Sequence, residues 1–160
     1  MRMTLFGLAL AVLAGLASTA AYAQTVPNLS GTWVLQLDKS DFGMGPAPQS
    51  RTDVYDHQEP KLNIKRTVVS ETTGETTSNL VYVVDGKPYK NMVGTNELTS
   101  TLNWEGQTLV MVSTVTTPQG EATITDRISL SADGKTMNQA RTLSIGGQQI
   151  SQTMVLAKQP

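Results

Sequence analysis

Residues 121–130 read EATITDRISL, a run in which apolar and polar side chains alternate almost without interruption. One phase holds Ala122, Ile124, Ile128 and Leu130, and the other phase holds only polar residues. Successive side chains of a β-strand point to opposite faces, so this alternation is typical of a strand that buries one face. The run therefore predicts a strand.

Segments of this kind recur along almost the whole chain, separated by short turn-forming sequences. The predicted strands are residues 30–37, 51–58, 61–69, 77–84, 87–93, 97–104, 107–117, 121–130, 136–145 and 148–157. The segment 107–117 is apolar in both phases, which predicts a central strand. No segment shows the i, i+3, i+4, i+7 apolar spacing over the length that a helix needs. About ten short strands with regularly spaced turns predict an all-β, antiparallel protein.

The connections between these segments have distinct turn chemistry. Asp85-Gly86 and Asp133-Gly134 are Asp-Gly pairs, which are typical of tight hairpins whose two turn residues both have positive φ. Residues 38–50, DKSDFGMGPAPQS, form the longest irregular stretch and are rich in Pro and Gly. Long loops in compact domains are often functional, so we expect this stretch to act as a lid.

The short connections favour an up-and-down meander of neighbouring strands. Such a sheet has two free edges, and closing the sheet on itself removes them. We therefore expect a closed barrel of about 8–10 strands, with a two-sheet β-sandwich as the alternative.

The first 23 residues have the three parts of a secretory signal peptide. Residues 1–4 form a short basic start, residues 5–16 are uncharged and apolar, and Ala21-Tyr22-Ala23 is an A-x-A cleavage pattern. The apolar run is too short for a comfortable membrane span, so we expect cleavage near Ala23 and no stable membrane anchor. The prediction is an exported protein, soluble in the periplasm or outside the cell, with residues 24–160 forming a single domain.

Composition excludes several classes of site and partner. Cleavage would remove only Arg2 of the 12 Lys and Arg, leaving 11 against 13 Asp and Glu. With no basic block in the sequence, a nucleic-acid partner is not expected. The chain has no cysteine, which excludes disulfides, thiolate catalysis and Cys-ligated metal centres.

The first predicted strand, residues 30–37, contains Gly31-Thr32-Trp33 near its start. This G-x-W motif resembles the lipocalin and wider calycin pattern. The resemblance implies a barrel in which Trp33 closes one end and a late Arg or Lys packs over it. Arg141 is the first candidate for this basic residue, and Arg127 and Lys158 are the others.

A second resemblance is to exported bacterial proteins that share G-T-W-x-L, K-S-x-F and a late D-G-K-T turn. Here these motifs are Gly31-Thr32-Trp33, Lys39-Ser40-Asp41-Phe42 and Asp133-Gly134-Lys135-Thr136. This resemblance implies a lipocalin-like β-barrel and no settled activity.

Polar side chains interrupt the apolar phases of three predicted strands: Arg66, Asp126, Gln139 and Arg141. If these phases face inward, the barrel interior contains charges, which must be paired, hydrated or used. One interpretation is a cavity in which Arg66 or Arg141 binds a ligand carboxylate, with Tyr82 and Trp104 forming its walls. The alternative is an internal ion pair between Asp126 and an arginine, or a register shift that turns these groups outward.

His57 is the only histidine, so it cannot build a multi-histidine metal site. It lies among Asp53, Asp56 and Glu59, and we expect this segment to be a solvated strand face. The acidic residues do not match a calcium-binding loop, so no metal or other cofactor is predicted. A G-x-S-x-G nucleophile motif is also missing, and no catalytic residue is assigned.

These observations favour a non-catalytic, exported protein that binds a small, mostly apolar ligand in the barrel. The candidate ligand-binding residues are Arg66, Tyr82, Trp104, Asp126 and Arg141. Two alternatives remain open: an envelope protein–protein interaction module with a solid barrel core, and a barrel enzyme or haem-handling protein. Sequence does not separate them, because a cavity and a packed core use the same alternation of side chains.

Overall fold

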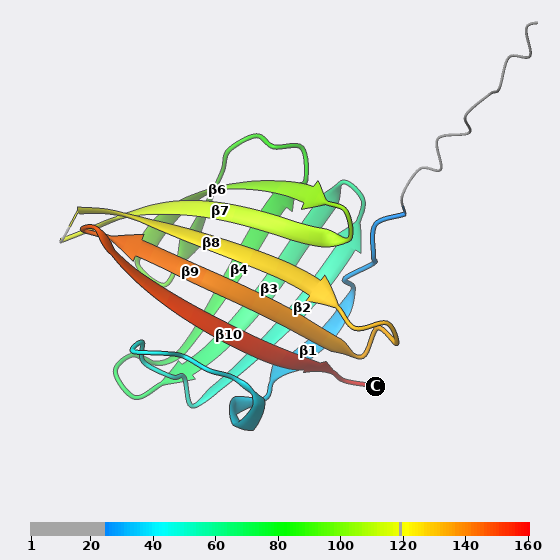
Figure 1. Cartoon of the computed structure of the whole chain (residues 1–160), viewed down its shortest axis with the longest axis horizontal. Helices are drawn as coiled ribbons and strands as arrows, with labels where there is room; N and C mark the ends of the chain where they lie inside the picture. The colour runs from blue at the N-terminus through cyan, green and yellow to red at the C-terminus, as the bar shows by residue number, and fades with distance from the viewer. Residues whose placement is uncertain (1–24, 119) are drawn as a thin grey trace, which may run out of the picture.

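The computed structural model describes residues 25–118 and 120–160, so the predicted signal peptide lies outside the described residues. Antiparallel strands account for most of this part (Figure 1). They are β1 (Gly31–Leu35), β2 (Ser50–Gln58), β3 (Lys61–Ser70), β4 (Gly74–Val83), β5 (Tyr89–Val93), β6 (Asn96–Glu105), β7 (Thr108–Thr117), β8 (Gly120–Leu130), β9 (Thr136–Ile145) and β10 (Gln148–Lys158). A short 3₁₀ turn, η1 (Leu37–Lys39), follows β1. Each strand matches one predicted segment, with ends that differ by about three residues at most.

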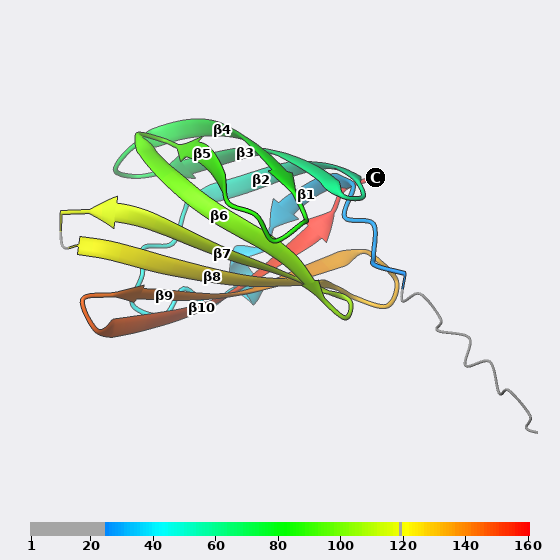
Figure 2. The ribbon, with the colours of Figure 1, turned by 90° about the horizontal axis from the view of Figure 1, so that it is seen from above.

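The strands form one sheet in the order β4-β3-β2-β1-β10-β9-β8-β7-β6-β5. The first strand pairs with the last through Trp33↔Lys158, Val34↔Ala157 and Leu35↔Leu156. The sheet curls until its edge strands, β4 and β5, approach each other (Figures 1 and 2). The predicted up-and-down barrel is therefore confirmed, rather than the two-sheet sandwich. The predicted central strand is β7, which pairs with β6 on one side and with β8 on the other.

The seam between β4 and β5 is bridged by a side chain. The amide of Asn91 accepts a hydrogen bond from the Val81 N–H at 2.8 Å and donates one to the Val81 carbonyl at 3.1 Å. One buried side-chain amide thus makes both contacts that a strand residue would make, and it holds the edges of the barrel together.

The two Asp-Gly turns differ from the expectation. Both glycines have positive φ, 72° at Gly86 and 67° at Gly134, but no other residue type has positive φ in the described part of the chain. The aspartates instead accept backbone hydrogen bonds with their carboxylates, from Lys87 N–H and from Lys135 N–H. Such local capping holds the turn without positive φ at Asp. The second turn closes the β8–β9 hairpin, whereas the first leads across the seam.

One end of the barrel is closed by Trp33, which has no exposed surface. Its indole N–H donates to the Leu29 carbonyl at 2.9 Å, and the Lys158 ammonium lies 5.4 Å from the ring centroid. Lys158 therefore takes the covering role implied by the calycin resemblance, through a cation–π contact. Arg141, the first candidate, is not that residue and lies among the interior charges, while Arg127 is exposed.

The glycine of the G-x-W motif also has a structural reason. Gly31 has φ of 135°, a conformation that side chains rarely adopt, and a Cβ there would lie 2.5 Å from Cε of Lys158. Gly31 thus lets the covering lysine approach β1.

Residues 36–49 run beside the other end of the barrel, which we call the mouth. Backbone hydrogen bonds of 2.7 Å join Asp41 to Thr153 of β10 in both directions, and the Gln152 amide donates to the Phe42 carbonyl. The loop is therefore tied to the last strand. Among residues 25–118 and 120–160, no helix has the length and apolar character needed to cross a membrane.

Candidate ligand-binding site

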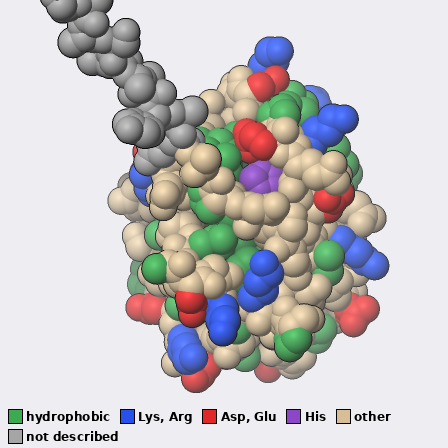
Figure 3. Space-filling model, turned by 90° about the vertical axis from the view of Figure 1, so that its right-hand side faces the viewer, with side chains coloured by type: hydrophobic (Ala, Val, Ile, Leu, Met, Phe, Trp, Pro, Cys, Tyr) green, Lys and Arg blue, Asp and Glu red, His purple; other side chains and the backbone are tan. Residues whose placement is uncertain are grey.

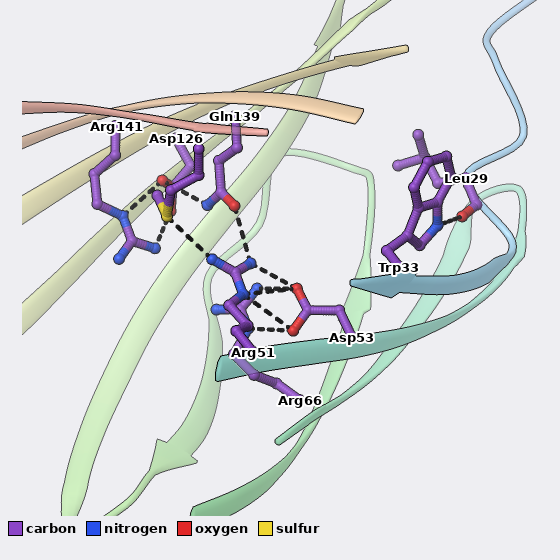
Figure 4. Close-up of polar contacts among 9 residues, drawn as sticks. Leu29, Trp33, Arg51, Asp53, Arg66, Asp126, Gln139 and Arg141 are labelled. Carbon is purple, nitrogen blue, oxygen red and sulfur yellow. Dashed lines mark hydrogen bonds and ion pairs between the residues drawn. The ribbon is translucent and has the colours of Figure 1, made fainter. Parts of the chain in front are cut away.

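The barrel interior contains a continuous chain of polar side chains that links opposite walls (Figure 4). We call it the polar chain, and its members are Arg51 and Asp53 of β2, Arg66 of β3, Asp126 of β8, and Gln139 and Arg141 of β9. Members on the same strand are two residues apart, so the strand alternation points both inward.

One half of the polar chain is centred on Asp53, which has no exposed surface. Its carboxylate accepts a hydrogen bond of 2.6 Å from Arg51 Nη2, and bonds of 2.9 and 3.0 Å from Nε and Nη2 of Arg66. Two guanidinium groups therefore share one buried carboxylate.

The other half is centred on Asp126, which is also buried. Arg141 donates to both of its carboxylate oxygens, at 2.8 and 3.0 Å. The amide of Gln139 joins the two halves: Nε2 donates to Asp126 at 2.9 Å, and Oε1 accepts from Arg51 at 2.9 Å. The internal Asp126–arginine ion pair is thus present, as the sequence alternative predicts.

Electrostatics keep both carboxylates charged. Burial alone would raise the pKa of Asp53, but the attraction of Arg66 and Arg51 outweighs it and holds this pKa well below its usual range. The pKa of Asp126 is lowered in the same way, with Arg141 outweighing burial. The pKa of Arg51 is lowered by burial and then by the like charge of Arg66. Arginine side chains stay protonated in proteins, so the polar chain carries three arginine charges against two carboxylates.

Two cavities open beside the polar chain at the mouth. One has a volume of about 360 Å³ and lies between the polar chain and the loop residues Phe42, Pro46, Ala47 and Pro48. The other has a volume of about 200 Å³ and is lined mainly by apolar residues: Leu80, Tyr82, Leu98, Met111, Val115 and Ile124. Arg66 and Arg141 line both cavities, so they lie where the two meet.

A larger hollow of about 620 Å³ lies at the closed end, beside residues 25–28 and the 129–134 turn. The side chains lining it are uncharged. It offers an acidic ligand no counter-charge, so the mouth cavities are the better candidate site.

Four of the five predicted site residues come together. Arg66, Tyr82, Asp126 and Arg141 all line the smaller cavity. The fifth, Trp104, does not: its indole donates to Glu59 at 3.1 Å, at the closed end.

The expected solvated face around His57 is wrong for His57 and Asp53, which are buried, whereas Asp56 and Glu59 are exposed. His57 is 5% exposed, its Nδ1 accepts a hydrogen bond from the Leu29 N–H at 3.2 Å, and its Nε2 lies 2.8 Å from the Glu59 carboxylate. On the face shown in Figure 3, which is the closed end, the single histidine forms a small area of the surface. The reason is the alternation of β2, which turns Arg51, Asp53, Tyr55 and His57 inward together. Through its hydrogen bond with the Leu29 N–H, His57 holds the segment that leads into β1.

Sequence reasoning missed Arg51 and Asp53 as members of the site. Both share the inward phase with Tyr55, but β2 reads SRTDVYDHQ, in which the inward phase is as polar as the outward one. The sequence did contain a sign that this phase faces inward: the opposite charges of Arg51 and Asp53, two residues apart, share it with Tyr55.

The hydroxyl of Tyr55 is buried and has no hydrogen-bond partner among the described residues. An unsatisfied buried polar group costs about 1–3 kcal/mol. We therefore expect Tyr55→Phe to raise the free energy of unfolding by about 1 kcal/mol, measured by urea denaturation at neutral pH. Tyr82→Phe is the control and should not stabilise, because Ser100 lies beside the Tyr82 hydroxyl, which is not among the buried polar atoms left without a partner.

Tyr55→Phe should also change how the free energy of unfolding depends on pH in the alkaline range. Burial, followed by the charge of Asp53, raises the pKa of Tyr55 to about 12. A raised pKa gives stability that is complete below the unfolded-state pKa of about 10 and is lost as pH rises to about 12. This loss should be smaller in Tyr55→Phe; an unchanged profile, or a destabilised variant, would contradict the assignment.

No protein-family model matches the sequence, and the search of curated proteins finds no match either. Solved structures match in fold. Zebrafish ileal bile acid-binding protein, complexed with cholic acid, aligns with a TM-score of 0.55 and 12% identity, over 81% of this chain and 98% of that one. Fatty-acid-binding protein 1 of Echinococcus granulosus gives a TM-score of 0.53 and 13% identity, over 82% and 97%. This chain folds as a calycin-like β-barrel.

Another calycin-like barrel in this comparison is secretory abundant heat soluble protein 4 of Ramazzottius varieornatus, with a TM-score of 0.53 and 12% identity, over 86% of this chain and 100% of that one. At these identities the similarity establishes the fold alone. The fold that the G-x-W resemblance implies is thereby confirmed.

Proposed function

We propose that this calycin-like barrel is a non-catalytic binding protein for a small, mostly apolar molecule that carries one acidic group. The observation that carries the proposal is the position of Arg66 and Arg141, which lie where the two mouth cavities meet. An anion placed between them would balance the third arginine charge of the polar chain, because a buried charge is costly unless it is paired.

The cavity walls support an apolar body for this ligand. Phe42, Pro46, Val93 and Met154 line the larger cavity, and its volume lies within the range of small-molecule sites. Two proteins of similar fold bind bile acid or fatty acid by name, and both ligands combine a carboxylate with an apolar body. We further propose that the protein acts after export, as the leader-like residues 1–23 predict.

The direct test uses the mature protein, residues 24–160. Native mass spectrometry of protein purified gently from its exported fraction should find a co-purifying small acid that is released on denaturation. The fluorescent anion 1-anilinonaphthalene-8-sulfonate (ANS) should also bind to the folded protein, and octanoate should displace it. Absence of both a co-purifying molecule and ANS binding would overturn the proposal and favour the interaction module with a solid core.

Arg141→Met should weaken octanoate binding at least tenfold, because hydrogen bonds to charged groups contribute about 1.5–3 kcal/mol. Binding of the uncharged analogue 1-octanol should change little, since only the anion needs the guanidinium. Arg127→Met is the matched control, because Arg127 lies on β8 with its side chain exposed.

Arg141→Met also leaves Asp126 with Gln139 as its remaining partner, so the variant's unfolding midpoint is measured beside its affinity. Equal losses for octanoate and 1-octanol would mean that Arg141 only maintains the fold.

A further inference from the structure

The polar chain spans the barrel interior from β2 and β3 on one wall to β8 and β9 on the opposite wall. On each of the four strands that carry the polar chain, the next inward residue towards the closed end is buried and has an apolar or aromatic side chain. These residues are Tyr55, Ile64, Ile128 and Met137. Beyond these residues, the closed end is filled by side chains with 0–1% exposure: Leu29, Trp33, Leu62, Leu102, Leu109 and Leu156. The interior therefore consists of a packed half and a half that opens at the mouth.

The boundary between these halves is tight. Asp53, Asp126 and Gln139 are between 0 and 1% exposed, although two of them are charged. Each of them is hydrogen-bonded to another member of the polar chain, so together they form one bonded layer between these four strands. Both mouth cavities contact this layer through Arg66 and Arg141.

From these observations we propose that the polar chain limits the length of the ligand; this inference rests on the binding function proposed above. The polar chain forms the inner boundary of the binding site, which we call the floor. Its consequence is selection of a compact acid, whose carboxylate lies at Arg66 and Arg141 and whose apolar part fills only the space up to the mouth. A long alkyl tail gains nothing below the floor, because apolar atoms there would meet bonded charges and a filled core.

The depth of the site follows from strand geometry. On β3, Arg66 lies at the floor and Ser70 at the mouth, which is roughly 13 Å along the strand at about 3.3 Å per residue. The depth along the barrel axis is smaller, because barrel strands are tilted. An extended chain of about ten carbons has a comparable length, given C–C bonds of about 1.5 Å.

Gln139 is the positioning residue of this floor. It has no exposed surface, and its amide alone connects the Asp53 half to the Asp126 half among the described contacts. Gln139→Ala would remove the connecting atoms and open the floor, whereas Gln139→Met would keep the volume and lose the hydrogen bonds. The two variants thus separate the space that Gln139 fills from the bonds that it makes.

The experiment is a chain-length series from hexanoate to palmitate, measured on wild-type protein by displacement of ANS at low concentrations of acid. Affinity should rise about fourfold per added methylene while the chain fits, and then level off before laurate. In Gln139→Ala the plateau should move to longer chains, and in Gln139→Met it should stay in place.

The outcomes are distinct. A rise that continues at the same rate through palmitate in the wild-type protein would overturn the floor while leaving the binding function intact. Failure of every alkanoate and of ANS to bind would overturn the proposed function, and the inference with it. Since the wild-type series decides between these results, the test does not depend on the variants folding.

Discussion

Replacing Trp33 by alanine should lower the free energy of unfolding by about 3–5 kcal/mol, among the largest losses for any single apolar side chain here. Trp33 is fully buried, and it packs among the residues that fill the closed end. The substitution removes its burial, leaves a cavity, and deprives the Leu29 carbonyl of its indole donor at 2.9 Å. It also ends the contact with the Lys158 ammonium.

Urea denaturation followed by far-UV circular dichroism measures this loss independently of tryptophan fluorescence. Trp104→Ala is the matched control, because Trp104 lies at the same end but is only partly buried. A loss below about 1 kcal/mol for Trp33→Ala would show that the G-x-W tryptophan is not part of the barrel core.

The strands of this barrel could be predicted from sequence because period-two alternation is a local property. In β8 the inward residues are largely apolar, so the pattern alone fixes both the element and its buried face. The closure was also predictable, since hairpin-short connections leave two edges that a barrel removes. The seam was not predictable, because the Asn91 amide bridges β4 and β5 through contacts with Val81, ten residues away in sequence.

The site was predictable only in part, and the reason is charge pairing. Arg66 and Asp126 stand out because each interrupts an otherwise apolar phase, and Arg141 stands out together with Gln139 between Met137 and Leu143. In β2 the inward phase holds Arg51 and Asp53, and the outward phase holds Val54, which is 42% exposed. A hydrophobicity pattern assigns such a strand to solvent, since it cannot register that Arg66 of another strand neutralises the buried carboxylate. His57 was assigned to a solvated face for the same reason, because it shares the polar inward phase of β2 with Arg51 and Asp53.

Replacing Asp53 by asparagine should be at least as damaging, with a loss of about 3–5 kcal/mol. The substitution keeps the shape of the side chain and removes the carboxylate charge that Arg51 and Arg66 share at 2.6 and 2.9 Å. Breaking a buried ion pair from one side leaves the partner charge uncompensated, and here two charges are left. The matched control is Asp56→Asn, on the same strand but with its side chain exposed.

The pH dependence of unfolding identifies the cause. Arg66 and Arg51 hold the pKa of Asp53 below its usual range against the effect of burial, so the carboxylate stabilises the fold fully above the unfolded-state pKa of about 4. That contribution is lost as pH falls from this value towards the lowered pKa of the folded state. Urea denaturation should therefore show a steep acid limb in wild-type protein and in Asp56→Asn. The limb should be shallower in Asp53→Asn, where Asp126 alone retains a lowered pKa inside the barrel. An acid limb of equal steepness in Asp53→Asn would contradict the ion-paired role of Asp53, even if the variant were destabilised.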